Sequence, residues 1–265
     1  MATNIKRKTA IVTGGATGLG YAVAEQFLEQ GDTVVLNGRT ESKLQRAAQQ
    51  LGQSDRVAIV AGDITEPQTA DKIVTEAVNR FGRVDVLVNN AGIFDMKPFT
   101  DYSVEDLDAF LGYLRGTFVT SQAAVRQMRK QGDGGAIINI STILALNGVN
   151  GLPSSAPIAA KGGITALTKN LSVELAADNI RINAVAPGIV PTPLYGELND
   201  DQHKAFHKMQ PLGRYGTPKD IADAVLYLAN ANWVTGVILP VDGGVDAGGD
   251  GAYHGGEAAT SSAGG

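Results

Sequence analysis

Cysteine is absent from this chain of 265 residues. Its absence excludes disulfide bonds, thiol catalysis and thiolate metal ligands, and it is compatible with a reducing compartment. Clusters of basic residues are missing as well, and the formal net charge is −5. An acidic chain without basic patches is a poor partner for nucleic acid or for an anionic membrane surface, so we expect neither.

Long hydrophobic runs are also missing. No segment approaches the roughly 20 apolar residues that a membrane-spanning helix needs, and the first residues lack the pattern of a signal peptide. We therefore expect a soluble, cytoplasmic protein. Hydrophobic residues nevertheless make up 43% of the sequence, which is enough for the core of one large domain.

Short apolar runs alternate with longer amphipathic stretches along the chain. The runs are rich in Val and Ile and are apolar on both sides, which is typical of parallel strands buried on two faces. We expect strands at Thr9–Val12, Thr33–Leu36, Val57–Val60, Val84–Val88, Ala136–Ile140, Ile180–Val185 and Val237–Val241. We expect helices at Gly20–Glu29, Glu41–Leu51, Gln68–Arg80 and Ala222–Ala229. This order predicts an α/β fold with a doubly wound parallel sheet of the Rossmann type in three α/β/α layers, within a single domain of residues 1–244.

Two regions interrupt the alternation. Residues 188–213 form a connection too long for an ordinary loop, and we expect a substrate lid there. His203 and His207 in this region have helical spacing, but no carboxylate–histidine cluster accompanies them, so we predict no metal site. Residues 245–265 are mostly Gly, Ala, Ser and Asp, a composition that predicts a flexible C-terminal tail.

A glycine-rich turn follows the first predicted strand. Its sequence is Thr13-Gly14-Gly15-Ala16-Thr17-Gly18-Leu19-Gly20, and a helix is predicted to start within it. Glycines allow a tight turn and close approach of the backbone to a pyrophosphate, while the helix N-terminus offers free N–H groups. The spacing resembles the Thr-Gly-x-x-x-Gly-x-Gly motif of the short-chain dehydrogenase/reductase family, of the classical type.

Four further motifs in the same order extend this resemblance over nearly the whole chain. They are Asp63-Ile64, Asn89-Asn90-Ala91-Gly92, Asn183–Gly188 followed by Thr192, and Val241–Gly244. In this family such motifs contact the adenine, support the sheet beside the cofactor and border the nicotinamide. The resemblance implies a cofactor site made of Gly14, Thr17, Gly18, Leu19, Gly20, Arg39, Thr40, Asp63, Ile64, Asn90, Ala91, Gly92, Lys161, Pro187, Gly188 and Thr192.

The end of the second predicted strand bears on the choice of dinucleotide. An acidic residue there would bind the ribose 2′-hydroxyl of NAD, and the sequence has none. Arg39 instead offers a bidentate donor for a 2′-phosphate, and Thr40 adds a hydroxyl. We predict NADP as the cofactor, with NAD as the alternative.

The catalytic positions depart from the family pattern. Lys161 matches the lysine of the family's Tyr-x-x-x-Lys motif, but Pro157 occupies the tyrosine position. Thr142 aligns with the catalytic serine, with Ser141 as the fallback, and Tyr113 stands where the family has an asparagine. Proline has neither a proton nor a hydrogen-bond donor to offer a developing alkoxide. Its backbone is tolerated in a first helical turn, which Ser154 or Ser155 can cap.

Three interpretations of this site remain open. The protein is an oxidoreductase with a non-standard proton donor, for which Tyr113 is the candidate; or it binds a dinucleotide without turnover, as a sensor or assembly partner; or its site is rebuilt for non-redox chemistry. The first is the one we favour, because a bound cofactor carries the hydride chemistry even when the general acid is lost.

The substrate and the assembly are predicted only in outline. We expect a small-molecule substrate that enters past the apolar side chains of Leu144, Leu146 and Leu152, with Tyr195 and Met209 from the lid. Members of the family commonly form tetramers through two long helices, which correspond here to residues 113–130 and 157–177. The second is rich in small and apolar residues, so we predict a homo-oligomer, specifically a tetramer.

Overall fold

A seven-stranded, wholly parallel sheet forms the centre of the computed structural model, with strand order β3-β2-β1-β4-β5-β6-β7. The structure describes all residues except 1–6, 53, 150, 193–205, 207–208 and 249–265. The strands are β1 (Thr9–Thr13), β2 (Thr33–Gly38), β3 (Val57–Ala61), β4 (Val86–Asn89), β5 (Gly135–Ile140), β6 (Ile180–Pro187) and β7 (Ile238–Val241). The predicted doubly wound fold is confirmed, since β1 lies between β2 and β4 and the order reverses there.

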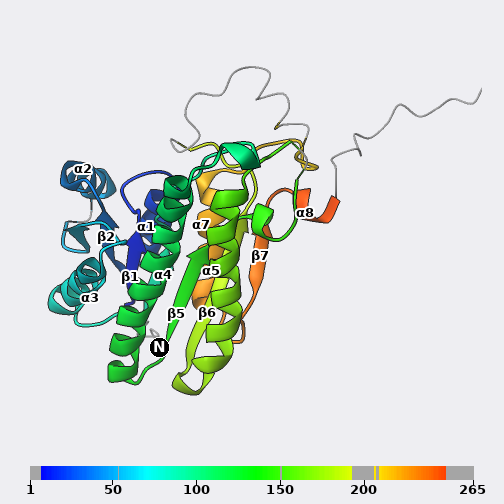
Figure 1. Cartoon of the computed structure of the whole chain (residues 1–265). Helices are drawn as coiled ribbons and strands as arrows, with labels where there is room; N and C mark the ends of the chain where they lie inside the picture. Colours follow the sequence, from blue (N-terminus) through cyan, green and yellow to red (C-terminus); the bar gives the residue numbers. More distant parts are fainter. Residues whose placement is uncertain (1–6, 53, 150, 193–205, 207–208, 249–265) are drawn as a thin grey trace, which may run out of the picture.

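Helices cover both faces of this sheet (Figure 1). They are α1 (Gly18–Glu29), α2 (Glu41–Leu51), α3 (Pro67–Phe81), α4 (Val104–Gln131), α5 (Ser155–Glu174), α7 (Pro218–Asn230) and the short α8 (Val245–Gly248), with 3-10 turns η1 (Phe99–Asp101), η2 (Ile143–Ala145) and η3 (Ala176–Asp178). One buried apolar cluster joins α1, α2 and α7 to the sheet, and a second joins α3, α4 and α5 to its other face. The predicted three layers are therefore present.

The predicted elements are all found, with shifts at their ends. The helix of the glycine turn begins at Gly18 rather than at Gly20, and β4 begins at Val86 rather than at Val84. The proposed tail starts with helix α8, because Val245 is buried against Ile143 and Ala186. Most of the proposed lid and the rest of the tail lie outside the described residues. No helix among those described is long and apolar enough to cross a membrane.

Local sequence explains where the two longest helices start. Ser103 caps α4 by accepting a hydrogen bond from the Asp106 N–H, and Asp106 accepts one from the Ser103 N–H, a capping box. Helix α5 starts after Ser154, as predicted, but the Ser154 hydroxyl donates to the Leu152 carbonyl oxygen and does not cap the helix. Pro157 lies in the first turn of α5, where its missing N–H is not needed.

Candidate active site

A pocket of about 350 Å³ lies at the carboxyl ends of the strands. Its walls come from the loops that follow β1, β2, β3, β4, β5 and β6, and from Lys161 on α5. Ligands of open parallel sheets bind at this edge, where the strand order reverses. We call the part after β2 and β3 the β2–β3 end of the pocket, and the part beside Ile140 and Lys161 the β5 end.

The glycine turn after β1 is shaped to receive phosphate groups. Gly14 and Gly18 have φ angles of 64° and 57°, a left-handed conformation that favours glycine. Thr17 precedes α1 with an extended backbone and makes no capping bond through its side chain, which leaves the first N–H groups of the helix available. These N–H groups and the helix dipole fit the pyrophosphate of a dinucleotide.

Gly20, which was predicted to belong to the cofactor site, does not line the pocket. A Cβ atom at this position would collide with the carbonyl oxygen of Gly14 and lie 2.6 Å from Asn90 Nδ2. Glycine at position 20 therefore lets α1 pack against the turn.

Thr13 and Asn90 hold the turn in place from below. The Asn90 amide donates to the carbonyl oxygens of Thr13 (3.0 Å) and Gly14 (3.1 Å). In return, Thr13 Oγ1 accepts from the backbone N–H groups of Asn90 (3.0 Å) and Ala91 (3.1 Å). The sequence analysis missed Thr13 as a positioning residue, although its place directly before the glycines was the available signal.

Cationic side chains gather at the β2–β3 end. Arg39 and Thr40 follow β2 and are exposed there, as predicted. Lys43, in the first turn of α2, also lines the pocket and was missed. Gly38 leaves room between the strand and α2, because an added Cβ would meet only the Leu44 side chain, at 3.5 Å. The end thus offers positive charge, and Asp63 is the acidic side chain among the described lining residues.

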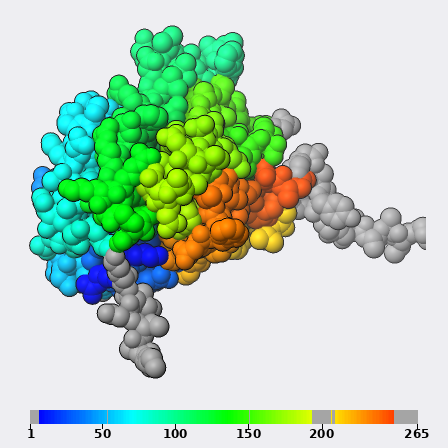
Figure 2. All heavy atoms as spheres, turned by 90° about the horizontal axis from the view of Figure 1, so that it is seen from below, coloured from blue at the N-terminus to red at the C-terminus, as the bar shows by residue number. Residues whose placement is uncertain are grey.

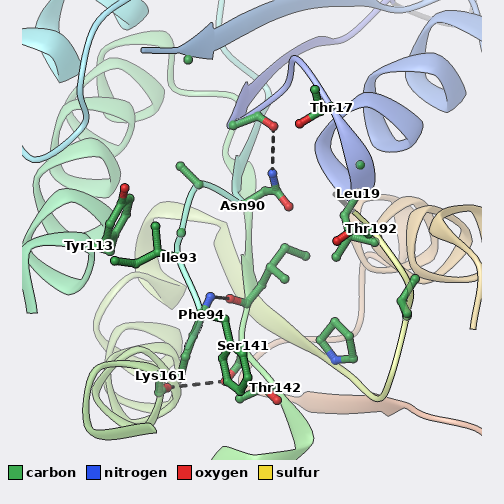
Figure 3. Close-up of a pocket in the computed structure, with 18 of the residues that line it drawn as sticks. Thr17, Leu19, Asn90, Ile93, Phe94, Tyr113, Ser141, Thr142, Lys161 and Thr192 are labelled. Carbon is green, nitrogen blue, oxygen red and sulfur yellow. Dashed lines mark hydrogen bonds between the residues drawn. The ribbon is translucent and has the colours of Figure 1, made fainter. Parts of the chain in front are cut away.

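Lys161 occupies the β5 end of the pocket (Figure 3). Its ammonium donates a hydrogen bond of 2.6 Å to the carbonyl oxygen of Ile140, and it lies beside Gly92, where an added Cβ would be 3.6 Å from Nζ. Burial lowers the pKa of Lys161 to about 8, because the charged form loses water without gaining a carboxylate partner among the described residues.

Two hydroxyl groups flank this lysine from the end of β5. Ser141 Oγ lies 3.0 Å from Thr165 Oγ1 and donates to the Lys161 carbonyl oxygen at 3.4 Å, so it faces α5. Thr142 Oγ1 accepts a hydrogen bond of 3.3 Å from the Leu144 N–H, and within the described part of the chain its proton is not given to another group. Both residues line the pocket, but only the Thr142 hydroxyl keeps a proton to donate to a ligand.

The comparisons with known proteins agree with this geometry. A family described as Enoyl-(Acyl carrier protein) reductase matches residues 14–246. A 3alpha-hydroxysteroid dehydrogenase from Mediterraneibacter gnavus is 39% identical over 90% of this chain and 97% of its own length. An L-rhamnose-1-dehydrogenase from Scheffersomyces stipitis is 38% identical over 90% and 95% of the two chains. A short-chain type dehydrogenase/reductase from Mycobacterium marinum superimposes with a TM-score of 0.85 and 32% identity, covering 90% of this chain and 95% of that one. The chain belongs to the short-chain dehydrogenase/reductase family.

The cofactor residues implied by the short-chain dehydrogenase/reductase pattern gather in this one pocket, with Gly20 as the exception. Pro187, Gly188 and Thr192 form the wall that follows β6. A Cβ at Gly188 would lie 2.7 Å from the Asp242 Cα, so glycine is needed where this wall passes the C-terminal motif. Enzymes of this family use nicotinamide dinucleotides, and the glycine turn and the residues that line the pocket fit such a cofactor.

Pro157, which the sequence motif predicts to stand at the family's tyrosine position, does not line the pocket. It is buried in the first turn of α5, one turn before Lys161. Its ring is too short to take the place of a phenol above the lysine. The β5 end of the pocket consequently has a lysine and a threonine hydroxyl, but no phenol from α5.

Tyr113 lines the same pocket but is turned away from Lys161 (Figure 3). Burial raises the pKa of its phenol; Arg39 lowers this pKa and Asp63 raises it further. The charged groups that act on Tyr113 therefore belong to the β2–β3 end. The Tyr113 ring packs against the apolar core between α4 and the sheet and does not point to the β5 end.

Apolar side chains form the mouth of the pocket at the β5 end. Those that line it are Ile93, Phe94, Met96, Ile143, Leu144, Leu152, Ile189, Val190 and Phe206. Leu144 and Leu152 were predicted here, whereas Leu146 does not line the pocket and packs against the buried cluster that contains Val245. Met209 does not line the pocket, and Tyr195, His203 and His207 lie outside the described residues. No group of three His, Asp or Glu side chains in the described part of the chain could hold a metal ion.

Proposed function

We propose that this protein is an NADP(H)-dependent oxidoreductase that interconverts a carbonyl compound and its alcohol, with a proton donor other than the usual tyrosine. Its membership of a family of dehydrogenases and reductases supports the reaction class. When bound, the reduced nicotinamide supplies the hydride. Lys161 and Thr142 then act on the carbonyl oxygen, and the glycine turn holds the pyrophosphate.

The preference for NADP rests on one observation, the pair of cations at the β2–β3 end. Arg39 and Lys43 both line the pocket, and Gly38, the last residue of β2, provides no carboxylate beside them. A 2′-phosphate would accept a bidentate hydrogen bond from Arg39 and a charge-assisted bond from Lys43. A ribose 2′-hydroxyl, by contrast, would find no acidic acceptor at Gly38.

The substrate we propose is an uncharged ketone or aldehyde with an apolar body, or the corresponding secondary or primary alcohol. The mouth of the pocket presents aliphatic and aromatic side chains, and the charged lining residues other than Lys161, namely Arg39, Lys43 and Asp63, lie at the opposite end within the described part of the chain. A polyhydroxylated sugar would leave its hydroxyl groups facing these apolar side chains without hydrogen bonds, which is costly.

Binding calorimetry and a substrate panel test this proposal. NADPH is expected to bind more tightly than NADH, and NADPH is expected to be consumed with apolar ketones faster than with sugars of similar size. Equal affinities for the two dinucleotides would contradict the cofactor assignment. Tight NADPH binding without consumption on any carbonyl or alcohol would favour the second candidate, a dinucleotide-binding protein without turnover, for which the buried Pro157 is the supporting observation.

We also propose that two copies associate through the surface of α4 and α5, as a step towards a tetramer. These helices lie side by side on the surface (Figure 2). Leu111 and Phe118 on α4 are exposed by 37% and 46%, and with Leu114, Ala166 and Leu167 they line a shallow groove. A second copy would cover the same groove on both chains, as expected of a symmetric interface. A location in the cytoplasm stays a prediction from the sequence.

A further inference from the structure

We propose that the ammonium group of Lys161 itself donates the proton in carbonyl reduction, in place of the phenol that Pro157 has replaced. The proposal rests on the oxidoreductase function proposed above and assigns its missing acid. It depends on three features of the pocket: where the ammonium lies, which groups surround it, and which hydroxyl can hold the substrate.

The first feature is the place of Nζ. The side chain of Lys161 extends from α5 into the pocket (Figure 3), and its Nζ lies beside the Ile140 carbonyl oxygen and Gly92. Only one hydrogen bond to the protein, to the Ile140 carbonyl oxygen, is made by Nζ among the described residues. An ammonium has three N–H donors, so two remain for a ligand or water. Since Lys161 is partly open to the pocket, a carbonyl oxygen bound there can receive one of them directly.

The second feature is the absence of a competing charge near Nζ in the described structure. The groups around it are the Ile140 carbonyl from β5 and the backbone of Gly92 after β4. From α4, Tyr113 is turned towards the β2–β3 end. Burial alone lowers the pKa of Lys161 to about 8. An acid of this strength is well matched to proton transfer near neutral pH, whereas an ordinary lysine with a pKa of about 10.4 is a much weaker acid.

The third feature is the Thr142 hydroxyl. Its oxygen accepts from the Leu144 N–H, and among the described residues its proton is not donated to another group. This proton is therefore available to the substrate carbonyl oxygen that Lys161 would protonate. Ser141 is less suited, since its hydroxyl is engaged with Thr165 and with the backbone of α5. Thr142 would orient the carbonyl and stabilise negative charge on its oxygen, while Lys161 transfers the proton.

The step balances as follows. The carbonyl carbon gains a hydride, and the π electrons of the C=O bond become a lone pair on oxygen. That oxygen forms an O–H bond as one N–H bond of Lys161 breaks. The lysine is left as a neutral amine, which recovers a proton from water at the open side of the pocket. In alcohol oxidation the same neutral amine is the base.

The pKa of Lys161 is measured first, without cofactor or substrate. The full-length protein is labelled with acetic anhydride at a series of pH values, and the labelled peptides are quantified by mass spectrometry. We expect the labelling of Lys161 to rise with a midpoint near pH 8. Lys169, which is exposed on the same helix, serves as the internal reference for the labelling reaction. A Lys161 midpoint equal to that of Lys169 would overturn the proposal.

Kinetics of two lysine variants complete the test. Lys161→Arg keeps the positive charge, but a guanidinium does not give up its proton. We expect kcat for ketone reduction to fall by at least about a hundredfold, within the range for loss of a general acid. The parent kcat/KM for reduction should decline above pH 8, as the acid deprotonates. The matched variant Lys169→Arg should change neither the rate nor the profile.

The outcomes separate this proposal from the function on which it rests. Wild-type turnover in Lys161→Arg, or an equal loss in Tyr113→Phe, would overturn the assignment of Lys161 while leaving the oxidoreductase function intact. If the parent protein consumes no NADPH with any carbonyl, the proposed function fails and the proton transfer fails with it. A loss of NADPH binding in Lys161→Arg, measured by calorimetry, would show that the lysine acts in binding and not as the acid.

Discussion

Asn90 and Thr13 are joined by two hydrogen bonds, one from the Asn90 side chain to the Thr13 carbonyl and one from the Asn90 backbone to Thr13 Oγ1, both of 3.0 Å. Together they fix the loop after β4 against the loop after β1. The phosphate-binding turn therefore does not hold its shape alone, since its geometry depends on the neighbouring strand.

Replacing Thr13 by valine should weaken both the fold and the cofactor site. Thr13 is fully buried, so losing Oγ1 leaves the Ala91 N–H without its acceptor, while the Asn90 N–H keeps only its bond to the Val88 carbonyl oxygen. A buried donor left unsatisfied costs about 1–3 kcal/mol. We expect a fall of this size in the free energy of unfolding, measured with urea, and weaker NADPH binding by calorimetry. Thr13→Ser retains the oxygen and should keep most of the stability and of the NADPH affinity. An unchanged urea midpoint in Thr13→Val would contradict the positioning role of Thr13.

The burial of Lys161 predicts a stability effect that depends on pH. Its pKa is about 8 in the folded protein and about 10.4 in the unfolded chain, so between these values the unfolded state binds more protons. The cost of burying the charge is thus fully present below pH 8 and disappears as the pH rises to about 10.4.

We therefore expect Lys161→Met, without cofactor, to be more stable than the parent at pH 7, by on the order of 2 kcal/mol. The difference should shrink as the pH rises from 8 to 10. Urea unfolding at both ends of this window measures it, with Lys169→Met as the control that should show no such trend. A constant difference in unfolding free energy between pH 8 and pH 10 would mean that the Lys161 ammonium is not desolvated in the folded protein.

Gly38→Asp should shift the cofactor preference from NADPH to NADH. The added side chain has space beside Leu44, and its carboxylate would repel a 2′-phosphate and accept hydrogen bonds from a ribose. Loss of a charge-assisted contact of roughly 1.5–3 kcal/mol corresponds to about tenfold to a hundredfold in NADPH affinity. Gly38→Ala adds bulk without charge and should leave the ratio of the two affinities unchanged. Calorimetry with NADPH and NADH measures this ratio for the parent and for both variants.

Pro157→Tyr should increase the rate of ketone reduction by at least about tenfold, the low side of the range for a general acid. The phenol would stand one helical turn before Lys161, whose positive charge lowers the pKa of a nearby phenol. Pro157→Phe provides the matched control, because it supplies the ring without the hydroxyl. Should both variants behave alike with normal NADPH binding, the pocket must have been remodelled for other chemistry.

Phe118→Glu should prevent the association that we propose across α4 and α5. A carboxylate in place of this half-exposed ring would be buried at the interface without a partner, at a cost far above that of a surface change. Light scattering after size-exclusion chromatography should show a smaller particle than for the parent. Val173→Glu is the control: its side chain is 79% exposed and is not part of the groove. An unchanged mass for Phe118→Glu would place the interface elsewhere.

The strands, the doubly wound sheet and the phosphate end of the pocket were predictable from the sequence because they leave local signals. Apolar runs of Val and Ile marked every strand, and the turn from Gly14 to Gly20 marked the phosphate end. The helix starts were predictable only in part: Asp106 completes the capping box of α4, whereas the Ser154 side chain bonds its own loop. A sequence pattern can predict where the backbone forms a strand or helix, but it does not predict the rotamer of a single hydroxyl group.

The direction of individual side chains in the site was the part that the sequence could not supply. Tyr113 aligns with a family position near the lysine, yet packing beneath α4 turns its phenol to the opposite end. Lys43 was missed because nothing in a run of charged helix residues distinguishes the one that faces the pocket. Each depends on how a helix is rotated against the sheet, which is set by the whole core rather than by local sequence.

The open space beside Gly38 has a consequence for how this protein can diverge. Any glycine codon becomes a codon for aspartate or glutamate by a change of its second base, and the structure accepts a Cβ at this position without rearrangement. Proline and tyrosine codons differ at two bases or more, so a tyrosine at position 157 requires at least two base changes. Under the proposed function, the preferred dinucleotide can therefore change by a single mutation, whereas a tyrosine donor on α5 cannot be gained in one step.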